Sequence, residues 1–503
     1  MSEKKPLGDF HEITILPGWT TSKTTYDKVD LSVELAPGVV LNYPFIAAAM
    51  TSVVGREMAL ACAKNGIMAV VPSQLSIEEA GSIVREVKQQ EVEKGDLEFV
   101  EKPEWIDDNR TIGDAIRRYN DVGHSVIPVC NDFRNLEALF LYQEGIPSDF
   151  YDIRLSDAIK SARRRKSGIG RIIKPFDIKR AKYGTDYCWD TDNSQNVYKR
   201  MRDGRKRCMP IVSRSGALKG LAFIYKYNGY LIGGAIHTYN WEERAETLLD
   251  AGVDIVFIDS SDGASDFQVR TIRRFKKRYP DKPICAGNIV ASTALMKKND
   301  RIIEVPVYER LVDAGADILK IGMGTGRICL TTENRGVGRL LMRALDDLYE
   351  ARSSTKSRYV PFIADGGIGT VDPDMDKRAR VRGNMRQDTR SINMALGRAE
   401  AVMMGSYFNM FEEAAGPEHV IDGRRFKESW GEGSFKAQSF ARYGIHEGVR
   451  RAHIEEGSYN LIPCVGRLKP GMERTALGVA MTLSNVGAAN LADYRELWRP
   501  EVV

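Results

Sequence analysis

The chain has 503 residues, of which 43% are hydrophobic and 28% are charged, with 45 glycines and 19 prolines. This composition is typical of a globular protein and argues against a disordered chain, a collagen-like repeat or a disulfide-rich miniprotein. The net charge of +5 slightly favours anionic small molecules as ligands and says little about nucleic acid.

The N-terminus and the cysteines indicate the compartment. Residues 1–14 are polar and charged, without the apolar core of a signal peptide. No uninterrupted run of about 18 apolar residues predicts a membrane span. The seven cysteines are scattered and form no C-x-x-C pair, which disfavours a zinc site and a disulfide framework. We therefore expect a cytoplasmic protein with reduced thiols.

Eight short apolar runs recur along the chain, and amphipathic helical stretches follow them. Runs that are apolar on both faces are typical of buried parallel strands. They lie at 44–50, 67–71, 230–236, 254–259, 283–287, 317–321, 360–364 and 401–404. Helical stretches follow, for example at 241–251 and 267–279. Eight strand–helix units predict an α/β fold of the (β/α)8 TIM barrel type. An open doubly wound sheet would also alternate strands and helices, but eight repeats favour closure.

A long insertion of different character separates the second helical stretch, 76–91, from the third strand. It holds two weak copies of one pattern, in which a helix leads into a strand with a central proline. The copies place helices at 111–120 and 196–203 and strands at 125–129 and 208–212, and the second continues through 216–223. This arrangement resembles a tandem CBS pair, or Bateman module, which implies binding of ATP or GTP. An insertion that only packs against the barrel is the alternative.

The insertion divides the chain into three parts. Residues 1–91 form the first part of the barrel, 92–227 the inserted CBS pair, and 228–503 the remainder of the barrel. A basic run at 163–166 lies in the insertion and has no interleaved aromatic residues. We therefore interpret it as a solvated face, or as a contact for nucleotide phosphates, rather than as a nucleic-acid site.

The segment GMGTGRICLTT, residues 322–332, carries the densest signal for chemistry. It follows the sixth predicted strand, and active sites of such barrels lie in loops at the carboxyl ends of the strands. Glycines at alternate positions allow the backbone to approach a ligand closely. Cys329 in this loop predicts a nucleophile, because thiolate attack requires partial exposure and an electropositive setting. The alternative is a buried, small apolar residue.

Nine segments in this order resemble the IMP dehydrogenase/GMP reductase family, and the resemblance extends over nearly the whole chain. They are DFHEITILPGW (9–19), AMTSV (49–53), IDSSDG (258–263), AGNIV (286–290), the Cys329 loop, ADGGI (364–368), MMGS (403–406), WGEGS (430–434) and EEG (455–457). The resemblance implies a purine nucleotide substrate, a nicotinamide cofactor and a homotetramer that CBS pairs can stack into an octamer.

The resemblance also assigns roles to individual residues. It implies that Cys329 adds to C2 of the purine, and that Arg327, Asp365, Gly366, Gly367, Gly405, Ser406, Glu432, Gly433 and Glu456 bind the nucleotide. It places NAD against Asp259, Ser260, Ser261, Asn288, Gly322 and Gly324, and half of a K⁺ site on the backbone carbonyls of Gly324, Gly326 and Cys329. By residue type, a carboxylate after a strand suits a ribose diol, and a helix N-cap is the alternative for Asp259 and Asp365. Glycines that end strands suit a phosphate held on backbone N–H groups.

The two branches of the family differ after the thiol has added. A dehydrogenase passes hydride to NAD⁺ and hydrolyses the covalent thioimidate to XMP, so it needs a mobile flap that carries a water activator. A reductase deaminates GMP and reduces the adduct with NADPH to IMP. Residues 431–457 form a long, polar segment with the pair Arg442-Tyr443, which resembles the dehydrogenase dyad, while Thr331 and Glu456 offer a second proton route. We therefore expect an NAD-dependent IMP dehydrogenase, with GMP reductase as the alternative.

The sequence departs from the family pattern at several places, and the departures at Arg327 and Ser429 motivate a further alternative, a nucleotide-sensing homologue with impaired catalysis. Arg327 replaces a serine that contacts phosphate, although arginine can pair with phosphate bidentately. Ser429 stands where a phosphate-binding tyrosine is common. The end of the chain, 493–503, lacks the Glu-Gly-Gly segment that completes the cation site in the family.

Overall fold

The structure is a computed structural model of the 503-residue chain. It describes residues 10–89, 97–122, 126–141, 146–163, 168–203, 208–224, 230–323, 334–355, 357–370, 387–432, 434 and 459–502. The chain divides into two compact units, of which the first comprises Met1–Glu93 with Asn228–Val503 and the second Lys94–Tyr227.

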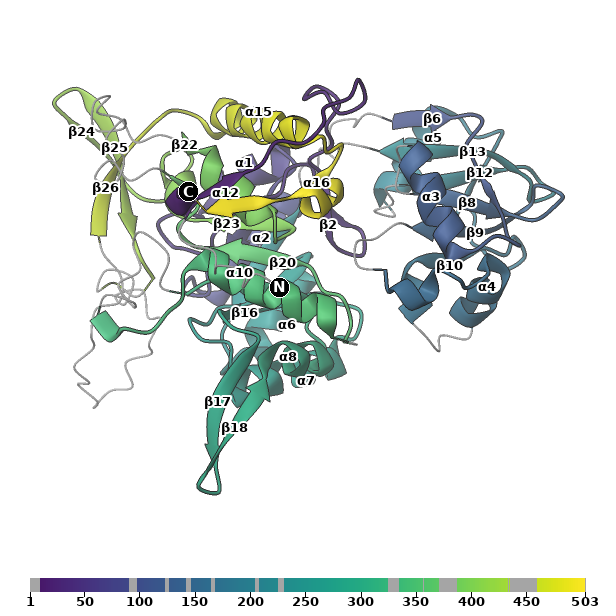
Figure 1. The fold of residues 1–503 in the computed structure, drawn as a ribbon. Helices are drawn as coiled ribbons and strands as arrows, with labels where there is room; N and C mark the ends of the chain where they lie inside the picture. Colours follow the sequence, from purple (N-terminus) through teal and green to yellow (C-terminus); the bar gives the residue numbers. More distant parts are fainter. Residues whose placement is uncertain are drawn as a thin grey trace. The chain divides into compact units, whose positions relative to one another are not determined.

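The first unit is built on a closed barrel of parallel strands (Figure 1). The strands follow one another in the order β14-β15-β16-β19-β20-β23-β4-β5. Their bounds are β4 (Phe45–Ala47), β5 (Met68–Val71), β14 (Ile232–Ile236), β15 (Ile255–Ile258), β16 (Ile284–Ile289), β19 (Ile318–Ile321), β20 (Phe362–Asp365) and β23 (Ala401–Met404). Each corresponds to one of the eight predicted runs, so the predicted (β/α)8 barrel is confirmed.

A helix follows each barrel strand in the chain. These are α1 (Arg56–Lys64), α2 (Ile77–Lys88), α6 (Glu242–Asp250), α7 (Asp266–Arg278), α8 (Val307–Ala314), α10 (Leu341–Ser354), α12 (Thr389–Leu396) and α13 (Ser406–Asn409). Helix α7 shows the local reason: Val269, Ile272 and Phe275 form one buried face, while its basic side chains cover the other. Within the described residues, no helix combines the length and apolar character needed to cross a membrane.

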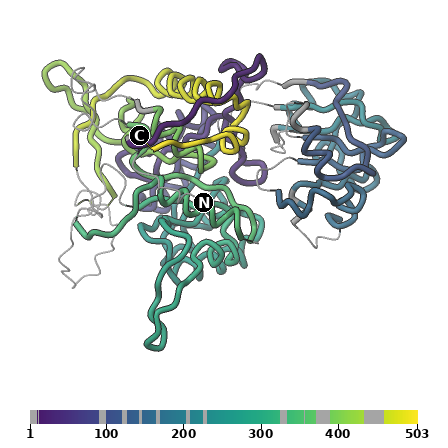
Figure 2. Tube along the Cα trace, viewed as in Figure 1, coloured from purple at the N-terminus to yellow at the C-terminus, as the bar shows by residue number. Residues whose placement is uncertain are grey.

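The two ends of the described chain meet on the barrel unit. Strand β1 (Ile13–Ile15), after the 3₁₀ helix η1 (Phe10–Glu12), pairs antiparallel with β27 (Pro500–Val502), and Figure 2 shows the purple and yellow segments side by side. Helices α15 (Leu468–Val486) and α16 (Leu491–Leu497) lead to β27. The short strands β2 (Val33–Ala36) and β3 (Val39–Leu41) form a separate pair.

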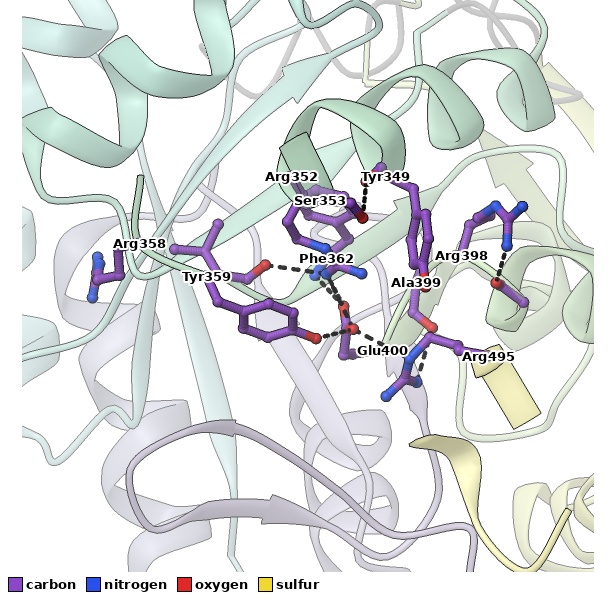
Figure 3. Close-up of polar contacts among 12 residues, drawn as sticks. Tyr349, Arg352, Ser353, Arg358, Tyr359, Phe362, Arg398, Ala399, Glu400 and Arg495 are labelled. Carbon is purple, nitrogen blue, oxygen red and sulfur yellow. Dashed lines mark hydrogen bonds and ion pairs between the residues drawn. The ribbon is translucent and has the colours of Figure 1, made fainter. Parts of the chain in front are cut away.

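Glu400 is the centre of a buried ion-pair network at the end of the barrel where the strands begin (Figure 3). Its carboxylate accepts hydrogen bonds from Arg352 of α10 at 3.1 and 3.2 Å, from the Tyr359 hydroxyl at 2.6 Å and from the Phe362 backbone N–H at 2.5 Å. Arg495 of α16 lies 3.4 Å away, and the side chains of Glu400 and both arginines are at most 6% exposed. Burial raises the pKa of Glu400, but the two arginines and the hydrogen bonds lower it more, so the net pKa is below its usual range.

Smaller sheets add to the barrel. Strands β17 (Thr293–Lys298) and β18 (Arg301–Pro306) form a hairpin that projects from the unit (Figure 1). Strands β24 (Glu418–Ile421), β25 (Arg424–Trp430) and β26 (Tyr459–Pro463) form a three-stranded antiparallel sheet, and β21 (Gly369–Thr370) pairs with β22 (Gln387–Asp388).

The second unit contains two four-stranded sheets, β10-β9-β8-β7 and β11-β12-β13-β6. The elements are β6 (Leu97–Val100), β7 (Ile106–Asp107), α3 (Ile112–Val122), β8 (Val126–Cys130), β9 (Leu136–Leu141), η2 (Ser148–Phe150), α4 (Leu155–Arg163), η3 (Gly168–Arg171), β10 (Ile173–Pro175), β11 (Cys188–Trp189), α5 (Ser194–Asp203), β12 (Cys208–Val212) and β13 (Leu218–Ile224). The runs β7-α3-β8-β9 and β11-α5-β12-β13 repeat one topology, and Pro128 and Pro210 occupy the same position in β8 and β12.

The two repeats exchange strands. Strand β6, which precedes the first repeat, pairs with β13 of the second, and β10, which precedes the second repeat, pairs with β9 of the first. Because each repeat completes the sheet of the other, the two repeats fold as one module.

Candidate active site

Most of the described candidate residues lie at the carboxyl ends of barrel strands. Asp259 follows β15, Asn288 lies near the end of β16, Gly322 follows β19, Asp365 ends β20 and Gly405 follows β23. Parallel strands of a closed barrel present these ends on one face, which is where active sites of this fold are found. The fold thus collects on one face residues that are far apart in the sequence.

A buried lysine joins Asp365 to Asn288. The Nζ atom of Lys320, on β19, donates to Oδ2 of Asp365 at 2.7 Å and also to Oδ1 of Asn288. The Nδ2 atom of Asn288 donates to the same Asp365 oxygen at 2.9 Å and to the Gly322 carbonyl at 2.6 Å. Burial lowers the pKa of Lys320, but the charge of Asp365 and the hydrogen bond to it raise the pKa above its usual value. The ammonium is therefore charged and orients the carboxylate.

Asp259 is held from the loop after β5. Its Oδ2 accepts hydrogen bonds from the Ser73 hydroxyl at 2.6 Å and from the Gln74 amide at 3.3 Å. Arg244 of α6 fixes this loop, because it donates to the two backbone carbonyl groups that flank Ser73 and Gln74, at 2.5 and 2.7 Å. Burial lowers the pKa of Arg244 to about 10, against the opposing effect of Asp259. Arg244 of α6 thus holds the loop after β5, and that loop holds the Asp259 carboxylate.

Neither acid is a helix cap. Helix α7, which follows Asp259, is capped by Ser265, whose hydroxyl accepts from the Gln268 backbone N–H at 3.3 Å. Asp365 is followed by a bend and then by strand β21 (Gly369–Thr370), so no helix begins in the residues described directly after it. The capping alternative is therefore wrong for both residues.

The loop after β4 meets the segment that contains Glu432. The Glu432 carboxylate accepts from the Thr51 backbone N–H at 2.6 Å and from the Thr51 hydroxyl at 3.0 Å. That hydroxyl in turn accepts from the Trp430 indole N–H at 2.8 Å, and the Ser52 hydroxyl donates to the Trp430 carbonyl at 3.1 Å. In this structure, one oxygen of Glu432 thus binds the β4 loop.

Ser429 has a structural contact instead of an open position. Its side chain is completely buried, and its hydroxyl accepts from the Asn409 amide at 2.6 Å. The same amide reaches the Ser52 hydroxyl at 3.2 Å, so Ser429 joins β25 to α13 and to the β4 loop. Ser429 therefore has a buried structural role in this structure.

Glycines allow the close approaches around these residues. Gly322 has φ +136, and a Cβ there would lie 1.9 Å from the Asp365 carbonyl oxygen. Gly366 and Gly367 also have positive φ, of +99 and +70. Gly405 precedes Ser406, the first residue of α13. Ser260 accepts the Asn288 backbone N–H at 2.9 Å on its carbonyl oxygen, while Ser261 is exposed; they are the remaining described candidates.

Replacing Gly322 with alanine is expected to displace Asp365. The new methyl group would overlap the Asp365 carbonyl, and φ +136 disfavours any side chain. We expect the KM for the nucleotide substrate that the resemblance implies to rise by about tenfold or more, because about 1 Å of misplacement can cost this much. Gly423→Ala is the control: its φ of +73 is also positive and strains an alanine, but a Cβ there meets nothing within 4 Å. Equal KM values for the two variants would contradict the prediction.

Several predicted residues lie outside the described residues. They are Gly324, Gly326, Arg327, Cys329, Thr331, Gly433, Arg442, Tyr443 and Glu456. The residues that flank the Cys329 loop are described: Met323 forms a β-bridge with Arg339, which donates to the Val290 carbonyl at 3.1 Å. Trp430 and Tyr459, on either side of the Arg442 segment, are paired across β25 and β26.

Metal binding has no support among the described side chains. No group of three or more His, Cys, Asp or Glu residues in the described part of the chain is placed to hold a metal ion. The carbonyl groups predicted for K⁺, those of Gly324, Gly326 and Cys329, lie outside the described residues.

Sequence reasoning missed four residues that hold the candidate site, namely Lys320, Ser73, Gln74 and Thr51. Lys320 could have been found from the sequence, because a charged residue inside the predicted strand 317–321 would be buried and would need a partner. Ser73, Gln74 and Thr51 had only their position after a strand. Their partners, Asp259 and Glu432, are more than 180 positions away in the chain.

A family model described as the IMP dehydrogenase / GMP reductase domain matches residues 9–501. The chain belongs to this family. The inosine-5'-monophosphate dehydrogenase of Tritrichomonas foetus is 29% identical over 97% of this chain and 92% of that protein. The enzyme of the same name from Pasteurella multocida is 27% identical over 97% and 91%. The family resemblance inferred from the motifs is thus confirmed.

A solved structure shares the fold of this family member. It is a variant of GMP reductase from Trypanosoma brucei in complex with guanosine 5'-monophosphate. The two structures have a TM-score of 0.61 and 24% identity, and the alignment covers 100% of this chain and 96% of the other. At this identity, the likeness supports the fold and does not separate the two branches of the family.

Proposed function

We propose that this family member is an IMP dehydrogenase that oxidises IMP to XMP with NAD⁺ and serves the synthesis of guanine nucleotides. The observation that carries the proposal is the family match over residues 9–501, together with relatives named IMP dehydrogenase that align with 97% of the chain. The strand-end carboxylates Asp259 and Asp365 support it, as does Arg442-Tyr443 between WGEGS and EEG.

The proposed reaction proceeds through a covalent bond to Cys329. The thiolate adds to C2 of IMP, and the hydride on C2 leaves to the nicotinamide ring, which NAD⁺ supplies as the acceptor. Water then adds to C2 of the thioimidate, and the C–S bond breaks to release XMP and the thiolate. The sum is IMP + NAD⁺ + H₂O → XMP + NADH + H⁺. Covalent catalysis of this kind divides one difficult step into two easier ones.

The described residues would bind the two nucleotides. Asp365 would accept hydrogen bonds from the ribose diol of IMP, and Gly366, Gly367, Gly405 and Ser406 would hold its phosphate on backbone N–H groups. Asp259 and Asn288 would face the nicotinamide ribose, with Ser260, Ser261 and Gly322 beside them. The hydrogen bonds that orient Asp259 and Asp365 support these roles, because an acceptor fixed in advance loses less entropy on binding.

The remaining roles belong to the residues outside the described part of the chain. We propose that Arg442 and Tyr443 activate the hydrolytic water, that Thr331 and Glu456 form the second proton route, and that Glu456 accepts the purine N1–H. Arg327 and Gly433 would complete the nucleotide site with Glu432. Arginine has an ordinary pKa above about 12, so the threonine–glutamate route supplies a hydroxyl and a carboxylate where Arg442 is a poor base.

We also propose a regulatory role for the second unit. Its two repeats with exchanged strands support a CBS pair, which would bind ATP or GTP. A cytoplasmic homotetramer, which the CBS pairs could stack into an octamer, and activation by K⁺ are further parts of the proposal. Sedimentation with and without each nucleotide, and activity in K⁺ against Na⁺, test these parts separately.

One experiment distinguishes the branches of the family. The purified chain is incubated with IMP and NAD⁺ in the presence of K⁺, and NADH absorbance is followed. We expect NADH formation that requires IMP, and no NADPH consumption with GMP. The reverse pattern would assign the chain to the reductase branch. Tight ATP or GTP binding with neither activity would assign it to the nucleotide-sensing alternative.

A further inference from the structure

Lys320 is a charged side chain within the barrel wall. Its side chain is 10% exposed and that of its partner Asp365 is 19% exposed. A buried ion pair adds little net stability, because the cost of removing both charges from water offsets their attraction. A packed apolar residue at this position of β19 would serve the fold as well, so stability does not account for the lysine.

We propose that Lys320 is a positioning residue: it fixes Asp365 and Asn288 so that the second carboxylate oxygen of Asp365 faces the ribose diol of the nucleotide. This inference rests on the proposed function. Lys320 and Asn288 both donate to Oδ2 of Asp365, at 2.7 and 2.9 Å. Among the described residues, no hydrogen bond or ion pair engages Oδ1 of Asp365, so that oxygen remains for a ligand.

The lysine also decides the orientation of the Asn288 amide. Lys320 can only donate, so the Asn288 atom that faces it must be the acceptor, Oδ1. The Asn288 NH₂ group is thereby directed to Asp365 and to the Gly322 carbonyl. A rigid triangle across three neighbouring strands, β16, β19 and β20, thus presents one carboxylate oxygen. Supporting contacts of this kind hold a functional group to the precision that recognition needs.

The charged and titratable groups that face Lys320 come from three other strands of the barrel. They are Asp365 on β20, Asp259 after β15 and the thiol of Cys285 on β16. Burial raises the pKa of Cys285 well above its usual value, so this thiol is neutral. The charges of two carboxylates therefore act on the Lys320 ammonium. Of these two, only Asp365 lies at hydrogen-bond distance from it in the described structure.

The test compares IMP with 2′-deoxy-IMP, which lacks one hydroxyl of the diol. Equilibrium dialysis measures both affinities without turnover, for the wild type, Lys320→Met and Lys320→Arg. Lys276→Met is the matched control. Lys276 of α7 is partly buried and pairs at 2.9 Å with Asp317, the residue before β19, at the end of that strand away from the site. Circular dichroism establishes that each variant is folded, and Lys320→Gln replaces Lys320→Met if the latter does not fold.

We expect the wild type and Lys276→Met to prefer IMP by about tenfold or more, since a hydrogen bond to a charged group is worth that much. Lys320→Met should bind IMP about tenfold more weakly and should bind both nucleotides almost equally, while Lys320→Arg should restore the preference. A folded Lys320→Met or Lys320→Gln with the wild-type preference would overturn the inference. Absence of NADH formation by the wild type would instead overturn the proposed function. The binding comparison would still test the positioning role of Lys320.

Discussion

Cys329→Ala is expected to abolish NADH formation, by about 10⁴-fold or more, while leaving the fold unchanged. Without the sulfur, C2 of IMP cannot become the tetrahedral centre from which hydride leaves. The substitution removes a single sulfur atom and leaves the core residues of the described barrel unchanged. Steady-state NADH absorbance with IMP and NAD⁺ measures the loss, and circular dichroism and IMP binding measure the retained fold.

Two variants make this prediction specific. Cys464→Ala removes a half-buried thiol that follows β26, and should retain activity. Arg442→Gln should form about one NADH per site and then stop, because hydride transfer precedes the hydrolysis for which we propose Arg442 as the water activator. Rapid mixing with absorbance detection shows such a burst. Activity in Cys329→Ala, or its loss in Cys464→Ala, would contradict the assignment of the nucleophile.

Glu400→Gln is expected to destabilise the barrel unit by about 3–5 kcal/mol, because it leaves two buried arginines without their counter-charge. Arg352 and Arg495 would face a neutral amide in a site that is nearly closed to water. The midpoint of thermal unfolding of this unit, followed by calorimetry, should fall. Glu418→Gln is the control. It also removes a carboxylate that pairs with an arginine, Arg425, but at the surface, so the unfolding midpoint should change little.

The effect of Glu400 should depend on pH in a defined direction. Its folded-state pKa is lowered, so the contribution to stability is complete above the unfolded-state pKa of about 4.3 and is lost as the pH falls through the lower folded-state value. The difference in unfolding midpoint between the wild type and Glu400→Gln should therefore be largest at neutral pH and shrink in acid. A difference that is constant with pH, or absent at neutral pH, would contradict the prediction.

The position of each candidate acid was predictable, but its partners were not. Asp365 and Asp259 follow apolar runs, and this local pattern placed them at strand ends. Lys320 and Asn288, however, contact Asp365 from 45 and 77 positions earlier in the chain. The capping alternative also could not be excluded from sequence, because the distance from each acid to the next helix start is a property of the folded loop. Ser429 is a similar case, since its burial against Asn409 depends on α13 and β25 packing together.

The sequence by itself determined the barrel, the repeated insertion and the family, because strand and helix periodicity and short motifs are local properties of the chain. The tertiary structure alone decided how the site is held: which oxygen of Asp365 remains for a ligand, how the Asn288 amide is oriented, and that Glu400 pairs with arginines from two helices. The physical reason is that barrel closure brings distant strands within hydrogen-bond distance. The partner of a buried charge is set by that proximity and not by its neighbours in the chain.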